Sequence, residues 1–280
     1  MGYTSSLTDQ EWEIIEPLLP QKKRTRPPIW TKRQILDGIF YQLKNGCAWV
    51  DLPKDLPPSS TVYWHYKQWR ESGVFDKIMT ALHEEVRAKA AKKPKWTTLI
   101  IVDTQAAKNT CNASVESKGF CHYKATNGIK RNLAVDTMGF PFFTHCTKAN
   151  VSDDQGLIEM FSANIEYFKA KPVNIAKITV LVDHGYHIGH LTRELEQIYP
   201  QIMTKIKFEV APKPTREEKS AQGKSGFVVT PTRWVVERSN AWVERSKSLV
   251  KNFDRTLDNA NARLKLCFIR LMLKRLARAS

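Results

Sequence analysis

Two short runs of β-branched and apolar residues, each followed directly by an aspartate, constrain the fold of this chain most strongly. The first run, 97–102, precedes Asp103, and the second, 178–182, precedes Asp183. Runs of this length and composition predict strands buried inside a sheet. An aspartate at the end of such a strand leaves the core where open α/β sheets bind their ligands. If the two strands are parallel neighbours, both carboxylates emerge at the same sheet edge.

A third acidic residue, Glu237, lies near the start of a long basic helix pattern that begins at Arg233. A helix that crosses the predicted sheet edge could bring this glutamate to the two aspartates. Carboxylate oxygens are the ligands that Mg²⁺ prefers. Two divalent ions about 3.5–4 Å apart serve phosphodiester chemistry by activating the attacking oxygen and stabilising the leaving oxygen. The sequence therefore indicates metal-assisted chemistry on a phosphodiester.

Each of these acids also has a simpler interpretation. An aspartate after a strand often forms a turn or caps a helix, which applies to Asp183 before its glycine-containing segment. Glu237 lies four residues after Arg233, at the spacing of a surface ion pair. Asp136 is a competing strand-end acid, which we interpret as a hairpin turn residue. Glu244, two turns beyond Glu237 on much the same predicted helix face, is the alternative third ligand.

The charge of the chain predicts a polyanionic partner. Lys and Arg number 44 against 28 Asp and Glu, a formal net charge of +16. Nucleic acid and an anionic membrane surface both fit this excess. Nucleic acid is favoured, because no apolar stretch reaches the roughly 18–20 residues of a spanning helix. The five scattered cysteines and the absence of a secretory signal predict free thiols and a cytoplasmic, nucleoid-associated protein.

Basic residues near the acidic set are predicted to bind DNA, because a carboxylate triad repels a phosphate backbone unless cations neutralise it. The alternative is that they form a solvated helix face. The predicted DNA-binding residues are Lys67, Arg70, Lys130, Arg131, Arg233, Arg238, Arg245, Lys247 and Lys251. The polar and charged stretch 213–224 predicts an exposed loop that also touches DNA.

The first 93 residues are predicted to form a small helical domain. Helices are predicted after the capping residues Thr8, Thr31 and Ser60, with a fourth at 76–91. Short basic helices that are rich in aromatic residues and joined by tight turns are typical of a helix-turn-helix DNA-binding domain. A helical packing domain with no DNA contact is an equal alternative. The basic segment 92–95 predicts a domain boundary.

Residues 94–280 alternate between strand and helix patterns and predict a mixed α/β sheet covered by helices. The turn 137–139 joins two of the strands in a hairpin. The predicted strands are 99–102, 128–136, 140–144, 178–182 and 207–211. The predicted helices are 153–168, one that begins near 187–189, 233–253 and 257–279.

Motifs spread over nearly the whole chain resemble those of bacterial insertion-sequence transposases of the DDE (Asp-Asp-Glu) type. In the helical half they are 7–12, 17–20, 38–49 and 60–63. In the second half they are 102–103, 132–139, 147–153, 182–186 and 233–238. The chain departs from the family pattern at Thr230 and Glu244, where a Tyr and a Lys are frequent.

The resemblance implies a ribonuclease H-like mixed sheet flanked by helices, preceded by a small all-α helix-turn-helix type domain. It implies a transposase that binds the terminal inverted repeats of an insertion sequence, cleaves the ends and joins them to target double-stranded DNA. Catalysis and metal binding would fall to Asp103, Asp183 and Glu237, with two Mg²⁺ ions for which Mn²⁺ can substitute. A homodimer on DNA is expected. The alternatives are a metal-dependent nuclease without strand transfer and a catalytically silent DNA-binding repressor.

Overall fold

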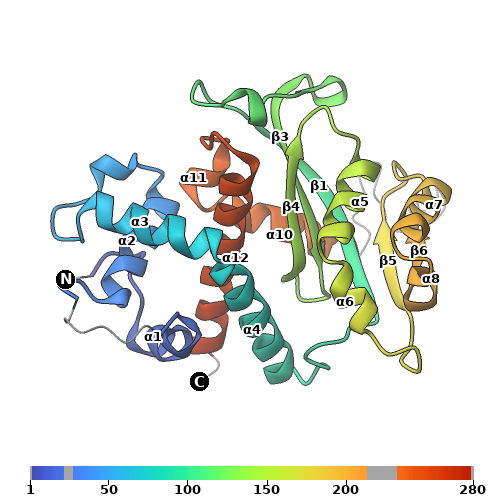
Figure 1. The fold of residues 1–280 in the computed structure, drawn as a ribbon, viewed down its shortest axis with the longest axis horizontal. Coiled ribbons are helices and arrows are strands. Elements are labelled where there is room, and N and C mark those ends of the chain that lie inside the picture. The colour runs from blue at the N-terminus through green and yellow to red at the C-terminus, as the bar shows by residue number, and fades with distance from the viewer. Residues whose placement is uncertain (1, 22–27, 213–231, 279–280) are drawn as a thin grey trace, which may run out of the picture. The chain divides into compact units, whose positions relative to one another are not determined.

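The computed structural model describes residues 2–21, 28–212 and 232–278, so the predicted loop 213–224 and Thr230 lie outside it. Contacts group the chain into two compact units (Figure 1). Unit 1 comprises Met1–Lys95, Lys108–Ser117 and Trp242–Ser280. Unit 2 comprises Trp96–Ala107 and Lys118–Ala241. The contact grouping places residues 108–117 and 242–280 with the first 95, and the division into domains at residue 93 stays a prediction.

Unit 1 is helical. Its helices are α1 (Asp9–Ile15), α2 (Lys32–Asn45), α3 (Ser59–Glu71), α4 (Val74–Lys89), α11 (Lys247–Val250) and α12 (Leu257–Arg278), with short 3₁₀ turns at Glu16–Leu18, Trp49–Asp51 and Val115–Ser117. The predicted caps at Thr8 and Thr31 are confirmed as complete capping boxes, and Gly46, with φ of 69°, ends α2. The third helix begins at Ser59 with Pro58 as its N-cap, so the predicted cap at Ser60 is wrong.

The core of unit 1 forms around α12. Leu264, Phe268, Met272 and Leu276 recur at helical spacing and are fully buried. The helix packs against α4, α1 and α2, which explains why the C-terminal residues group with the first 95. Amphipathic periodicity predicted the buried face of this helix but not its partners.

A buried ion pair joins α12 to the segment before it. Arg263 Nε donates to Asp254 Oδ1 at 2.8 Å, and the two side chains are 9% and 8% exposed. The same guanidinium donates to Gln42 Oε1 of α2. It also lies 5.7 Å from the centroid of the Trp49 ring. These contacts satisfy a charge that burial would otherwise make costly.

Replacing Arg263 with Met is expected to lower the free energy of unfolding by about 3–5 kcal/mol, because Asp254 is left buried without a cation. Urea denaturation measures the change. Arg275→Met, at an exposed position of the same helix, should cost no more than about 0.5 kcal/mol. The double variant Arg263→Met/Asp254→Asn should recover part of the loss. A double variant as unstable as the single one would contradict this account.

Unit 2 is built on a mixed sheet. Its strands are β1 (Leu99–Lys108), β2 (Phe120–Cys121), β3 (Thr126–Val135), β4 (Pro141–Lys148), β5 (Ile178–Val182) and β6 (Ile206–Val210). The order is β2-β3-β1-β5-β6, and β4 also pairs with β3. Strands β1, β5 and β6 run parallel, whereas β3 is antiparallel to β2 and β4. The predicted mixed sheet and its hairpin are confirmed.

Helices pack against this sheet. They are α5 (Asp153–Ala163), α6 (Ile165–Ala170), α7 (Ile188–Ile198), α8 (Ile202–Lys205) and α10 (Trp234–Val243), with a 3₁₀ turn at His122–Lys124. In Figure 1 α5 and α6 lie in front of the strands and α10 lies behind them. The main core cluster joins buried residues of the strands with those of α5, α6 and α7, including Val102, Phe161 and Leu191.

Two predicted helices are interrupted. The helix predicted at 153–168 breaks at Asn164, whose side chain donates to the carbonyl of Met160 at 2.8 Å. The helix predicted at 233–253 ends at Val243 and resumes at Lys247. Asp136 is confirmed as a turn residue, because its carboxylate accepts from the amides of residues 138 and 140. Within the described parts of the chain, no helix has the length and apolar character needed to cross a membrane.

Candidate active site

The parallel pairing of β1 with β5 sets Asp103 beside Asp183. The register pairs Leu99 with Thr179 and Ile101 with Leu181. Continued by two residues, it puts Asp103 level with Asp183. The prediction that Asp103 ends its strand is wrong, because β1 runs on to Lys108. What ends before Asp103 is the pairing with β5, and both aspartates lie just beyond the paired stretch.

A single arginine lies between the two aspartates. Arg233 Nη2 is 2.8 Å from Asp103 Oδ1 and 3.9 Å from Asp183 Oδ2. Its Nη1 donates to the carbonyl of Val102 at 3.4 Å. The side chain of Arg233 is 12% exposed, against 20% for Asp103 and 53% for Asp183. The guanidinium is therefore held against the sheet, and Asp183 is the more accessible carboxylate.

Helix α10 presents one face to Asp103. Asn240 Nδ2 donates to Asp103 Oδ2 at 2.7 Å, while Arg233 donates to the other oxygen. Arg233, the residue directly before α10, lies in line with Glu237 and Asn240, because neighbours three and four positions apart on a helix lie above one another. Glu237, which is half-buried, therefore lies on the face that contacts β1. Sequence reasoning missed Asn240, although its spacing from Glu237 was the available signal.

The alternative third ligand has a different environment. Glu244 follows the last residue of α10, lies in a turn and is exposed. The sequence pattern had indicated that Glu244 continues the helix face of Glu237. Because α10 ends before Glu244, it does not. The geometry favours Glu237 over Glu244, and the roles of both as ligands stay predictions.

The donor set suits a hard divalent cation in part. Asp103 and Asp183 bring carboxylate oxygens together around one positive charge, the chemistry that Mg²⁺ requires. In the described residues, however, no three acidic, histidine or cysteine side chains lie close enough together to hold a metal ion. The two aspartates therefore fit such an ion, and Glu237 would have to move closer to join them.

A hydrogen-bonded layer next to the aspartates supports the site. Thr104, the residue after Asp103, donates to Asn132 Oδ1 at 2.8 Å and lies 3.0 Å from the hydroxyl of Tyr186. These contacts tie β1 to β3 and to the turn after Asp183. Burial raises the pKa of the Tyr186 hydroxyl, so it stays protonated and can donate. A side chain at Gly156 of α5 would meet Asn132, since an added Cβ would lie 2.6 Å from its oxygen.

The nine residues predicted to bind DNA fall into two groups. Lys67, Arg245, Lys247 and Lys251 are exposed. The other five have protein partners or are buried. Lys130 pairs with Asp153 at 2.8 Å, and Arg131 is 3% exposed.

The remaining arginines bind protein groups. Arg233 pairs with Asp103, as described above. Arg238 donates to the carbonyl of Met138 at 2.8 Å and stacks 4.5 Å from the centroid of the Trp234 ring. Arg70 donates to Asn259 Oδ1 and pairs with Glu71 at 2.9 Å. These three arginines contact protein groups, so the exposed cations are the better candidates for DNA contact.

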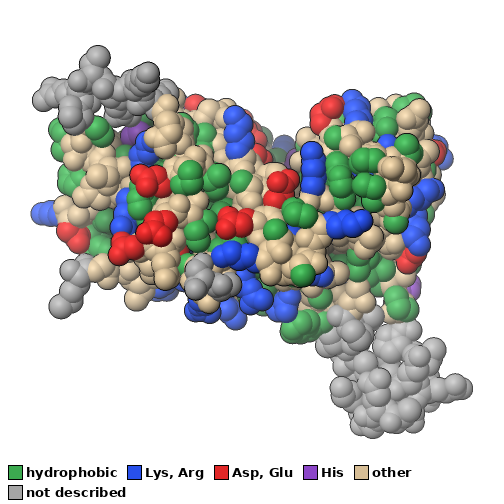
Figure 2. Space-filling model, turned by 90° about the horizontal axis from the view of Figure 1, so that it is seen from below, with side chains coloured by type: hydrophobic (Ala, Val, Ile, Leu, Met, Phe, Trp, Pro, Cys, Tyr) green, Lys and Arg blue, Asp and Glu red, His purple; other side chains and the backbone are tan. Residues whose placement is uncertain are grey.

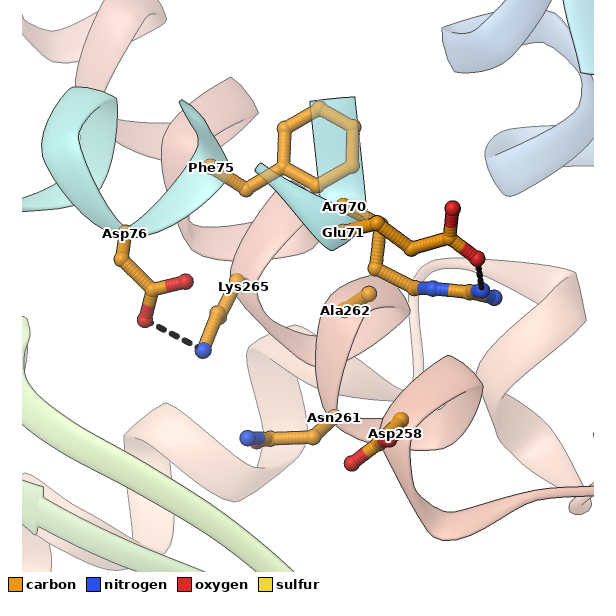
Figure 3. Close-up of a pocket in the computed structure, with 8 residues that line it drawn as sticks. All are labelled: Arg70, Glu71, Phe75, Asp76, Asp258, Asn261, Ala262 and Lys265. Atoms are coloured by element: carbon orange, nitrogen blue, oxygen red, sulfur yellow. Dashed lines mark hydrogen bonds and ion pairs between the residues drawn. The ribbon is translucent and has the colours of Figure 1, made fainter. Parts of the chain in front are cut away.

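A polar pocket of about 420 Å³ lies in unit 1 between α3, α4 and α12 (Figure 3). Four of its five charged residues are paired with one another: Lys265 binds Asp76, and Arg70 binds Glu71. Phe75 and Ala262 line its apolar side. Asp258, the fifth charged residue of the lining, is exposed.

The pKa of Asp103 gives a prediction. Burial raises the pKa of its carboxyl, and the Arg233 guanidinium opposes that rise. The carboxyl should titrate above the value of about 3.9 for a free aspartate. Because the fold then binds this proton more tightly, the contribution of Asp103 to the free energy of unfolding falls as pH rises between the unfolded and folded pKa values. Carboxyl ¹³C NMR measures the midpoint, and Asp103→Asn removes that pH dependence. A midpoint at or below 3.9 would contradict the prediction.

Two family models match the chain. Residues 7–79 match the model described as a putative transposase of the IS4/5 family. Residues 95–273 match the model of the transposase DDE domain. Such a domain has a ribonuclease H-like fold and uses divalent metal ions, so the fold class predicted from the sequence is confirmed.

Two curated proteins of Burkholderia cepacia are similar to parts of the chain. One, an uncharacterized 16.2 kDa protein of insertion element IS402, is 34% identical over 29% of this chain and 60% of its own length. The other, a putative transposase for insertion sequence element IS402, is 31% identical over 51% of this chain and 62% of its own length. The chain thus spans about three fifths of each of these relatives. No solved structure matches significantly.

Proposed function

Because the chain belongs to the family of transposases with a DDE domain, we propose that it binds the terminal inverted repeats of an insertion sequence, cleaves the element ends and joins them to target DNA. The observation that carries this proposal is the meeting of Asp103 and Asp183. They lie at the same level of adjacent parallel strands, facing a helix that carries Glu237.

We assign metal binding and catalysis to Asp103, Asp183 and Glu237. The proposed ions are two Mg²⁺, for which Mn²⁺ can substitute. When bound, such ions would activate the attacking oxygen, first of water and later of the 3′ hydroxyl. They would also stabilise the leaving 3′ oxygen. The protein groups orient the ligands: Asn240 fixes the rotation of the Asp103 carboxylate, and Thr104 ties the strand behind it to Tyr186.

DNA binding is assigned to exposed cations of the chain. On the face shown in Figure 2, basic and acidic side chains both occur, so charge does not mark this face as a DNA surface. In unit 1, α3 exposes Lys67 beside Tyr63 and Trp64, which are 41% and 52% exposed. A cation next to aromatic side chains suits both phosphate and base contacts. Bringing two ends together would require at least a homodimer on DNA.

Cleavage of the element ends tests the assignment. We expect a loss of cleavage rate of more than about 100-fold in each of Asp103→Asn, Asp183→Asn and Glu237→Gln. Removing a group that only hydrogen-bonds to a metal ligand costs up to about 100-fold, so removing the ligand itself should cost more. The assay uses labelled inverted-repeat duplexes with Mg²⁺ or Mn²⁺. Glu244→Gln is the matched control and should retain the wild-type rate. A large loss in Glu244→Gln with little loss in Glu237→Gln would reverse the assignment of the third ligand.

A strand-transfer assay separates the transposase from a metal-dependent nuclease. Pre-cleaved ends, target DNA and Mg²⁺ or Mn²⁺ should give joined products. Cleavage of intact ends without any joining of pre-cleaved ones would favour the nuclease. Absence of both activities, with end binding retained, would favour a DNA-binding repressor.

The two groups of cations should behave differently on substitution. Lys67→Ala should weaken binding to inverted-repeat DNA and reduce the slope of log affinity against log salt concentration by about one, the loss of one phosphate contact. Lys130→Ala should leave that slope unchanged, because its ammonium already pairs with Asp153. Fluorescence anisotropy at several salt concentrations measures both. An unchanged slope in Lys67→Ala, or a reduced one in Lys130→Ala, would contradict the division.

A further inference from the structure

The oxygens proposed to bind metal are already engaged by groups of the protein. Asp103 accepts from Arg233 through one oxygen and from Asn240 through the other. Asp183 accepts from the amide of His184 at 2.7 Å through Oδ1, and its Oδ2 is the oxygen 3.9 Å from Arg233. One guanidinium thus serves both aspartates.

This arrangement creates a conflict with metal binding. A divalent ion held by both carboxylates would need the same oxygens that Arg233 contacts. It would also place two like-charged groups side by side in a partly buried site, which is unfavourable. The guanidinium and the ion therefore compete for one position.

The arrangement also has a benefit without metal. Two carboxylates close together at a sheet edge repel each other, and burial increases that repulsion. A charge-assisted hydrogen bond to Asp103, with the same nitrogen near Asp183, offsets the repulsion. Arg233 also contacts the carbonyl of Val102, so the backbone helps to hold the guanidinium in place.

We propose that Arg233 is a positioning residue that takes the place of a cation between Asp103 and Asp183, and that the first divalent ion to bind displaces its guanidinium from them. The proposal rests on the proposed function, because it requires the two aspartates to be metal ligands. It assigns to Arg233 a role within the metal site in place of the DNA contact predicted from its charge.

Mn²⁺ binding and thermal unfolding of the full chain test the proposal together. Arg233→Met keeps much of the side-chain length and removes the charge. Without metal, its melting temperature should fall, because the carboxylates lose their cation. Its affinity for Mn²⁺, measured by electron paramagnetic resonance of free Mn²⁺, should rise about tenfold or more, the order of one hydrogen bond to a charged group. Unchanged or weaker Mn²⁺ binding would overturn the proposal.

The control is Arg238→Met, in α10, the helix that begins directly after Arg233. Arg238 donates to the carbonyl of Met138 and stacks on the Trp234 ring, so its loss should leave Mn²⁺ affinity unchanged. A general loosening of α10 would instead change Mn²⁺ affinity equally in both variants. Arg233→Lys, which keeps the charge but not the planar fork, should fall between wild type and Arg233→Met.

A measurement on the wild-type protein covers the case in which Arg233→Met does not fold. Addition of Mg²⁺ should shift the guanidinium NMR resonances of Arg233 and leave those of Arg238 in place. No shift at Mg²⁺ concentrations that saturate the site would overturn the displacement. Failure of the proposed function gives a different result: Asp103→Asn and Asp183→Asn would then bind Mn²⁺ as wild type does.

Discussion

The parallel pairing of β1 with β5 is the constraint on which the candidate site depends. Backbone hydrogen bonds fix the register from Leu99 opposite Thr179 to Ile101 opposite Leu181. Because side chains alternate between the faces of a strand, residues at the same level share a face, and a slip of one residue would separate them. The buried apolar side chains of both strands hold this register, so the packing of the core sets the distance between the carboxylates.

Helix α10 depends on that register in turn. Arg233, directly before the helix, and Asn240 within it reach the same aspartate from one side, and Glu237 lies between them on that side. Ser239 of the same helix is fully buried and donates to the carbonyl of Gly139 at 2.7 Å, which fixes the helix against the β3–β4 turn. The site therefore combines two strands and one helix, and each is anchored by contacts outside the carboxylates.

Sequence patterns predicted the parts of this site whose signals are local. The apolar run before Asp183 gave a strand with the observed bounds, and the capping residue Thr8 gave the start of α1. The continuation of β1 beyond Asp103 had no such signal, because the following residues Thr-Gln-Ala-Ala-Lys lack an apolar run. The grouping of α12 with the first helices depends on contacts more than 150 residues apart in sequence, such as Lys265 with Asp76. Periodicity carries no information about such pairings.

Of these sequence signals, charge said the least about which residues form the site. The excess of basic residues correctly marks a chain of a DNA-acting family, but it does not tell which cations are available. Lys130 and Arg70 differ from Lys67 in having an acidic or amide group within reach and in being less exposed, and both differences exist only in the fold. Arg233 is the clearest example. Its charge predicted a DNA contact beside the acidic residues, whereas its guanidinium pairs with Asp103. The electrostatics of such a site follow from the partners of each ion and from its burial, and net charge describes neither.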